Sequence, residues 1–134
     1  MRKEKLVKVF FGTLLVTATL LFLMSCGNDV GRYENATARN RAIGEQAVGI
    51  VDEFLDRRID ARTANSRIAD LGDIDHNTDN NADLFLGNTI VILRSRLTNY
   101  QSAQVLQSEN ISERFEAVLE TRNRLAVGLG MDER

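Results

Sequence analysis

The sequence predicts an all-α protein, a small antiparallel up-and-down bundle of three to four helices. From about residue 34 onward, apolar residues recur at intervals of three and four in four successive segments, which is the spacing of amphipathic helices. The connections between these segments are short, as they are where neighbouring helices of a bundle run antiparallel. The composition, with 43% apolar and 27% charged residues, is typical of a globular chain.

The first helical segment is expected to begin at about Glu34. Its apolar stripe lies at Ile43, Ala47, Ile50 and Phe54. Gly44 and Gly49 lie inside this segment, where a glycine costs up to about 1 kcal/mol relative to alanine. Two interpretations are open: the glycines allow another helix to approach closely, or they are merely tolerated.

A second, short helix is expected after a break at residues 59–60. Asp60 has the position of an N-cap, and Ile59 and Ala64 occupy the two positions of a hydrophobic staple. Gly72 is suited to end this helix. So short a helix is not stable alone, and we expect it to pack on the longer helices.

The third segment, residues 82–106, is predicted to be the central and most buried helix. Near its middle it is apolar over most of its circumference, at Phe85, Leu86, Ile90, Val91, Ile92 and Leu93. The β-branched run at residues 89–92 is also compatible with a strand, but the helical periodicity on both sides favours a helix.

The fourth segment begins at a predicted capping box, in which Asn110 caps the helix and Glu113 reaches back to it. Arg122 interrupts the apolar stripe of this segment. The bundle domain is expected to span residues 34–130, and residues 131–134 are expected to form a frayed tail.

The N-terminal segment has the features of a secretory signal peptide. Residues 2–8 are basic and residues 9–24 carry no charge, which corresponds to the n-region and the h-region of such a peptide. The uncharged stretch continues to Asn28 and is about as long as a membrane-spanning helix. An uncleaved N-terminal anchor is therefore the alternative.

Leu23-Met24-Ser25-Cys26 closes the apolar run and contains the only cysteine of the chain. It resembles the lipobox of bacterial lipoproteins, with Leu three positions before Cys and a small residue directly before it. The resemblance implies that residues 1–25 are removed as a signal peptide and that the Cys26 thiol carries a diacylglyceryl group.

The same resemblance implies that the mature chain is anchored to a cell membrane by lipid, on the extracytoplasmic side. Residues 26–33 are then the lipidated cysteine and a flexible tether, because this stretch is polar and contains glycine. Gly27, rather than Asp, follows the cysteine. Retention in an inner membrane is therefore not signalled, and the choice between inner and outer membrane stays open.

The charge of the mature chain excludes several partners. The first 25 residues hold four of the 17 basic groups and one of the 19 acidic groups, so the remainder carries five more acidic than basic groups. An acidic domain is a poor partner for nucleic acid, whose phosphates require basic patches. The excess of acidic groups also argues against adhesion of the domain to anionic lipid through a polybasic surface.

The polar loop at residues 73–83 contains candidate metal ligands at alternating positions, namely Asp73, Asp75, Asn77 and Asp79. This spacing resembles the start of an EF-hand calcium loop. However, Thr78 stands where that loop needs Gly, and Leu84 stands where it needs a bidentate Glu. A solvated connector whose side chains cap the next helix is therefore favoured. His76, the only histidine, is expected to be a surface residue, because a zinc site needs several His or Cys ligands.

A basic cluster follows the first helix, at Arg57, Arg58, Arg62 and Arg67. These arginines could bind an acidic partner through charge-assisted hydrogen bonds. Pairing with acids on the same surface is the favoured interpretation, and the expected partners are Asp56, Asp60 and Asp70.

No cofactor is expected, and no catalytic set of residues is recognisable, because the chain has one histidine and its one cysteine is assigned to lipid. The sequence therefore favours a non-enzymatic interaction or scaffolding module of the cell envelope, which binds an envelope protein partner. Surplus apolar residues at 85–93 would support this hypothesis. The alternative is a lipoprotein that binds a small ligand in a bundle cavity, or calcium in the loop at residues 73–83.

Overall fold

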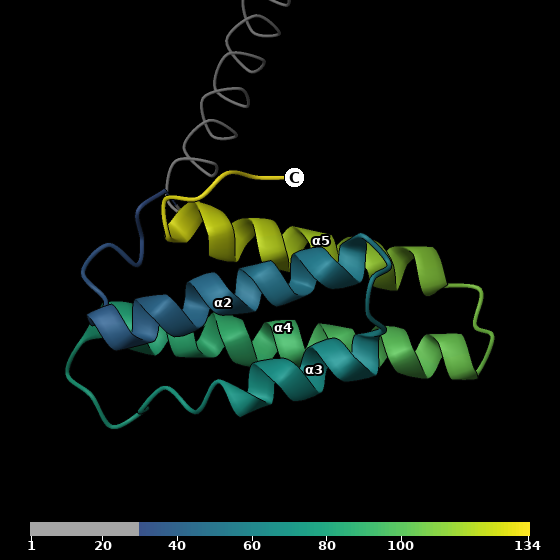
Figure 1. The fold of residues 1–134 in the computed structure, drawn as a ribbon, viewed down its shortest axis with the longest axis horizontal. Helices are drawn as coiled ribbons and strands as arrows, with labels where there is room; N and C mark the ends of the chain where they lie inside the picture. Colours follow the sequence, from purple (N-terminus) through teal and green to yellow (C-terminus); the bar gives the residue numbers. More distant parts are fainter. Residues whose placement is uncertain (1–29) are drawn as a thin grey trace, which may run out of the picture. The chain divides into compact units, whose positions relative to one another are not determined.

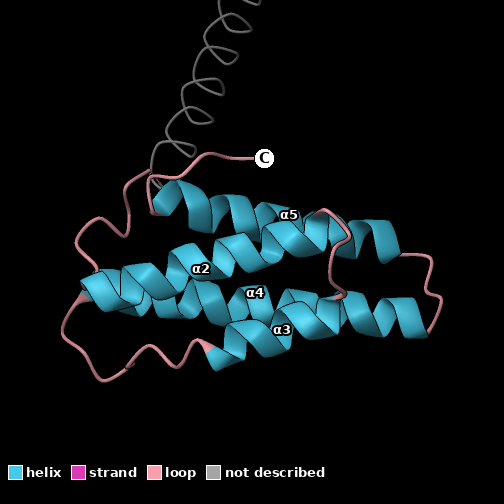
Figure 2. Ribbon diagram, in the orientation of Figure 1, coloured by secondary structure: helices cyan, strands magenta, loops and turns pink. Residues whose placement is uncertain are grey.

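The computed structural model describes residues 30–134 and contains four helices in this range. These helices are α2 (Ala38–Leu55), α3 (Ala61–Asp70), α4 (Asn81–Val105) and α5 (Ile111–Gly128). The described residues contain no strand (Figure 2), so the prediction of an all-α bundle is confirmed and the strand at residues 89–92 is excluded. None of the described helices is both long and apolar enough to cross a membrane.

The predicted signal peptide, the lipobox and Cys26 lie outside the described residues.

Within the bundle, α2 and α4 run in one direction, and α3 and α5 run in the other (Figure 1). Both α2 and α4 pack against every other helix, whereas α3 and α5 lie on opposite sides of this central pair. The core therefore forms where the inner faces of α2 and α4 meet the two outer helices.

The core draws aliphatic side chains from all four helices. Its fully buried members include Val48, Val51, Ile68, Leu86, Leu93, Leu97, Val118 and Leu125. Gly44 lies where two of the helices come close, because a Cβ atom there would be 3.0 Å from Cδ1 of both Leu86 and Leu129. A Cβ atom on Gly49 would meet nothing within 4 Å. The interpretation of close approach is therefore right for Gly44 and wrong for Gly49.

Replacement of Gly49 by alanine is expected to raise the free energy of unfolding, by up to about 1 kcal/mol, because alanine lowers the entropy lost on helix formation. Gly44→Ala is the matched control in the same helix. It should lower the free energy of unfolding by about 1 kcal/mol, because Leu86 and Leu129 are buried and have little room to move. Urea denaturation of both variants measures the two changes, and equal shifts would contradict the assignment.

After each described helix, the second residue beyond the last helical residue has a positive φ. Gly72 (φ 95°) ends α3, as the sequence predicts, and Gly130 (φ 78°) ends α5. Arg57 (φ 60°) and Gln107 (φ 51°) take the same place after α2 and α4. At these two ends the backbone forms the paired hydrogen bonds of a Schellman motif, for example from Arg58 N–H to the Glu53 carbonyl at 2.8 Å. A side chain other than glycine is strained there, which conceals these helix ends in the sequence.

Of the two helix N-caps predicted from the sequence, at Asp60 and Asn110, the structure contains the first and not the second. The Asp60 carboxylate accepts a hydrogen bond from Thr63 N–H at 2.7 Å and caps α3, as predicted. The capping box at Asn110 is wrong, because Asn110 (φ −94°, ψ 19°) makes no cap bond and instead accepts the Ser108 hydroxyl at 2.7 Å. The helix α2 begins differently again, with Thr37 N–H donating to the Asp83 carboxylate of α4 at 2.9 Å.

The described end of the expected tether is part of the bundle. Tyr33 is only 1% exposed, its hydroxyl shares a hydrogen bond of 2.7 Å with that of Thr89, and its N–H donates to the Gly128 carbonyl at 2.9 Å. Gly31 N–H already donates to the Val127 carbonyl at 3.3 Å. The domain therefore begins at Gly31, not at residue 34, and a tether reaching Tyr33 is wrong.

The C-terminal residues are held as well. Leu129 is buried, and Met131 N–H donates to the Ala126 carbonyl at 2.8 Å. The Arg134 side chain reaches Asp52 of α2 and Asp56, the residue that follows this helix. The prediction of a frayed tail at residues 131–134 is therefore contradicted, because backbone and side-chain bonds fasten this segment to α2 and α5.

The helix α4 is central but is not buried on every side. Phe85, Val91 and Ile92 are 44%, 54% and 44% exposed. The prediction that α4 is the most buried helix is wrong, because 8 of the 18 residues of α2 are buried against 9 of the 25 residues of α4. The surplus of apolar residues near the middle of α4 is a surface feature.

Candidate functional site

A cleft of about 720 Å³ lies between the C-terminal ends of α2 and α4 and the N-terminal ends of α3 and α5. Three aromatic side chains in its wall come from three helices, Phe54 from α2, Tyr100 from α4 and Phe115 from α5. The ring of Phe54 meets that of Tyr100 edge-on, with centroids 5.3 Å apart, and the other two centroid distances are 5.9 Å. Such pairs hold one another in place, so the aromatic wall is preorganised.

The cleft exists because α2 ends one residue after Phe54. The chain then turns through residues 56–60 and starts the shorter helix α3, which leaves Tyr100 and Phe115 only half-buried. This turn supplies Arg57 and Arg58 to the lining of the cleft. Arg57 is an exposed residue in the strained left-handed conformation, and within the described residues its guanidinium makes no hydrogen bond or ion pair.

Of the other polar lining residues, Arg58, Asp60 and Gln104 are bonded within the protein, whereas the side chains of Ser112 and Glu116 make no hydrogen bond or ion pair within residues 30–134. The Gln104 amide donates to the Tyr100 hydroxyl at 3.1 Å. The Thr63 backbone N–H holds the pKa of the Asp60 carboxyl below its usual range. The cleft thus combines aromatic surface with one guanidinium, of Arg57, and one carboxylate, of Glu116, that are available for charge-assisted bonds. Its volume lies in the range of ligand-binding pockets.

The basic cluster forms ion pairs, although not with all the expected partners. Arg58 pairs with Asp56 at 3.2 Å, as predicted. Arg67 pairs with Glu53 of α2 at 2.7 Å, and not with Asp70. This bond from Arg67 lowers the pKa of the Glu53 carboxyl. Arg67 therefore joins α3 to α2, Arg58 pairs within the turn after α2, and Asp60 caps α3 by accepting the Thr63 N–H.

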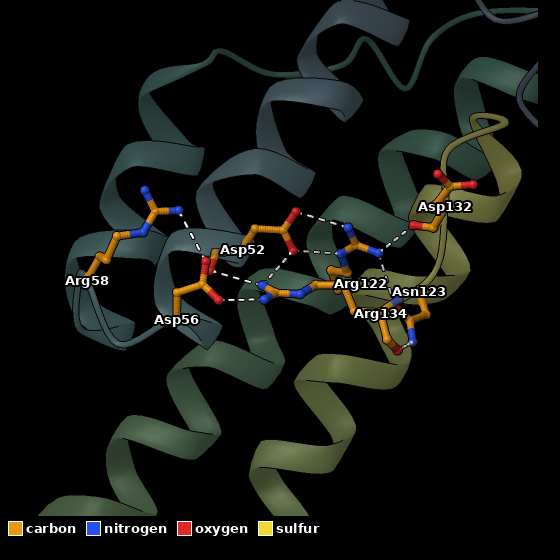
Figure 3. Close-up of polar contacts among 7 residues, drawn as sticks. All are labelled: Asp52, Asp56, Arg58, Arg122, Asn123, Asp132 and Arg134. Atoms are coloured by element: carbon orange, nitrogen blue, oxygen red, sulfur yellow. Dashed lines mark hydrogen bonds and ion pairs between the residues drawn. The ribbon is translucent and has the colours of Figure 1, made fainter.

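A second polar group links α2 to α5 and the C-terminal tail (Figure 3). Arg122 Nε and Nη2 each donate to one oxygen of the Asp52 carboxylate, both at 2.9 Å, and Arg122 Nη1 donates to the Asp132 carbonyl at 2.7 Å. Arg134 donates to Asp52 and Asp56. Sequence reasoning missed this network, and the only signal was an arginine in an apolar stripe.

Acid is expected to destabilise the fold. Bonds from Arg67, Arg134 and the Thr63 N–H lower the pKa of Glu53, Asp56 and Asp60. A carboxyl whose pKa is lower in the folded state stabilises the fold above its unfolded pKa, here 4.5 for Glu and 3.8 for Asp, and this stabilisation is lost as the pH falls through the folded pKa.

Urea midpoints measured from pH 7 to pH 2 should therefore be level down to about pH 5 and fall below about pH 4. Glu53→Gln should reduce this fall, whereas Glu45→Gln, at an exposed site outside these pairs, should leave it unchanged. A midpoint that stays constant across the acid range would contradict the assignment.

The loop at residues 73–83 acts as a connector. Asp75 accepts the Asn77 N–H at 2.8 Å, and Asn80 caps α4 by accepting the N–H groups of Ala82 and Asp83. Residues 30–134 hold no group of three or more His, Cys, Asp or Glu side chains placed to bind a metal ion. The structure therefore does not bring the acids of this loop together, and calcium binding there stays a prediction.

His76 is exposed, and its ring lies over Gly87, because a Cβ atom on that glycine would be 3.3 Å from His76 Cε1.

Comparisons of the chain with protein-family models, with curated proteins and with solved structures find no match. The assignment of function below therefore rests on the residues and their geometry.

Proposed function

We propose that this chain is a lipoprotein of a bacterial cell envelope that carries lipid on Cys26 and acts as a non-enzymatic interaction module. Its helical bundle is held outside the cytoplasmic membrane and binds a segment of another envelope protein. The observation that carries the second part is the aromatic cleft of about 720 Å³. The basic start, the apolar run and the lipobox-like end of residues 1–26 support the first part.

The place of the cleft suits an anchored binding module. The chain enters the bundle at Gly31, beside Val127 near the end of α5, whereas Ile111 and Phe115 at the start of α5 line the cleft. The 18 residues of α5 span about 27 Å. The tether and the lipid would therefore leave the cleft uncovered.

The chemistry of the lining indicates what it would bind. Three aromatic rings favour an apolar or aromatic side chain, and Arg57 favours a carboxylate beside it. A short peptide segment with an apolar anchor and an acidic residue combines both features. The strained backbone of Arg57 supports this assignment, because glycine would be more stable at this position.

Lipidation is tested by metabolic labelling with a radioactive fatty acid. The label should enter the wild-type chain and not Cys26→Ser, and the mature protein should begin at Cys26. A purified protein that keeps residues 1–25 and carries no lipid would refute this part of the proposal.

Partner binding is tested in intact cells with a photo-reactive amino acid at Gln104, which lines the cleft. The matched control carries the same group at Glu45, an exposed residue of α2 outside the cleft. A discrete cross-linked species should form from the first site only. It should disappear when Ser112→Trp fills the cleft and weaken in Arg57→Gly, which should be at least as stable as the wild type. Cross-linking that neither substitution changes would refute the role of the cleft.

A further inference from the structure

The exposed side of α4 forms a continuous surface of unusual composition. Residues seven apart in a helix point in nearly the same direction, which places Phe85 and Ile92 in one row and Leu84 and Val91 in a second. Asn88 lies between the two rows and is exposed. We call this surface, formed by Leu84, Phe85, Asn88, Val91 and Ile92, the α4 outer face.

The charges of α4 differ from those of the rest of the domain. The chain beyond residue 25 carries five more acidic than basic groups. The only carboxylate of α4 is Asp83, which is 2% exposed and accepts the Thr37 N–H. Arg96 is exposed one turn after Ile92. The α4 outer face therefore combines exposed apolar side chains with a nearby cation and presents no carboxylate.

The α4 outer face also lies beside the point where the chain enters the bundle. The Arg32 guanidinium carbon lies 4.2 Å from the centroid of the Phe85 ring, and the neighbouring Gly31 is bonded to the end of α5. Only four residues separate Cys26 from Gly31, so even a fully extended chain places Gly31 within about 18 Å of the cysteine. Lipid on Cys26 would therefore hold Phe85 close to a bilayer surface.

We infer that the α4 outer face docks on the surface of the lipid bilayer that holds the anchor. Phe85, Val91 and Ile92 enter the headgroup region, as the apolar side of an interfacial helix does, and Arg32 and Arg96 lie at the level of the lipid phosphates. This inference rests on lipidation of Cys26. The lipid supplies residence at the membrane, so the α4 outer face only has to orient the domain, and an acidic net charge does not oppose it.

Docking on this face would leave the cleft accessible. Tyr100 and Gln104 line the cleft from α4, and both lie about a third of a turn or more from Asn88, at the middle of the outer face, when projected down the helix axis. The bilayer would thus fix the orientation of the bundle, while the aromatic wall stays open to a partner beside the membrane.

The test uses the full lipidated chain in vesicles of phosphatidylethanolamine and phosphatidylglycerol. Because acylation consumes the Cys26 thiol, Asn88→Cys and the control Glu45→Cys each provide a single thiol for a fluorescent label. Iodide should quench the label at residue 88 several-fold less than the label at residue 45. A spin-labelled lipid should quench the label at residue 88 more. Equal quenching at the two sites by both quenchers would overturn the inference.

The other outcomes are equally decisive. A chain that does not float with vesicles is not lipidated, which refutes the proposed function together with this inference. A label at residue 88 that is protected from iodide but not quenched by lipid, and that becomes exposed when protein is diluted in the bilayer, identifies a second copy as the occupant and overturns docking on lipid. Phe85→Ser combined with Ile92→Ser should return the label at residue 88 to the control level, with unchanged far-ultraviolet circular dichroism, because both side chains are exposed.

Discussion

Replacement of Gly128 by alanine is expected to lower the free energy of unfolding by about 3 kcal/mol. The new Cβ atom would overlap with Cε2 and Cδ2 of the Tyr33 ring and lie 3.1 Å from its Cζ. This ring cannot move aside, because it is 1% exposed and its hydroxyl is bonded to that of Thr89 at 2.7 Å. The substitution therefore expels Tyr33 from the core, and the lost burial outweighs the higher helix propensity of alanine.

Urea denaturation measures this loss, with Gly49→Ala as the matched control, since a Cβ atom there meets nothing within 4 Å. The control should be at least as stable as the wild type. The double variant Gly128→Ala with Tyr33→Ala should be less destabilised than the sum of the two single changes, because the overlap is then absent. Equal stability of the wild type and Gly128→Ala would show that Tyr33 is not packed against this helix end.

Removal of the Asp52 carboxylate is the second large effect, and Asp52→Ala is expected to lower the free energy of unfolding by about 3 kcal/mol. The Arg122 side chain is only 6% exposed, and both Asp52 oxygens accept its hydrogen bonds. Without Asp52, a buried guanidinium loses its counter-ion but stays out of water. The cost of such a charge exceeds the net value of the pair itself.

Two further variants separate this mechanism from a general loss of contacts. Asp52→Ala combined with Arg122→Met removes both charges and keeps much of the volume, so it should recover most of the stability. Glu120→Ala breaks an exposed pair with Arg124 in the same helix and should change the free energy of unfolding by less than about 1 kcal/mol. The assignment is refuted if Asp52→Ala is as mild as Glu120→Ala in chemical denaturation.

The positions of the four helices were predictable because the signals for them are local. A helix shows itself by side chains three and four residues apart, and the cap at Asp60 involves Thr63 only three residues later. The helix end at Gly72 was recognisable for the same reason. The ends at Arg57 and Gln107 were not, because those residues take a backbone conformation that their identity disfavours.

The candidate site was only partly visible in the sequence. Arg57 and Arg58 stood out as part of a basic cluster, but the cleft they line needs Phe54, Tyr100 and Phe115. These rings lie on three helices, and each alone is one more apolar residue of a stripe. Whether the three rings come into contact depends on where α2 ends relative to α4 and α5. The apolar periodicity of a single helix carries no information about that position.

The sequence by itself determined the four helices, their short connections, the acidic character of the domain and the resemblance of residues 1–26 to a lipoprotein signal. Tertiary structure alone decided that Tyr33 is buried, that the outer face of α4 is exposed and that Arg122 is paired with a carboxylate 70 residues earlier. The physical reason is the distance along the chain over which each kind of interaction acts. Helix formation depends on neighbours within one or two turns, whereas burial and ion pairing depend on which distant segments meet, and that is settled only when all the helices pack together.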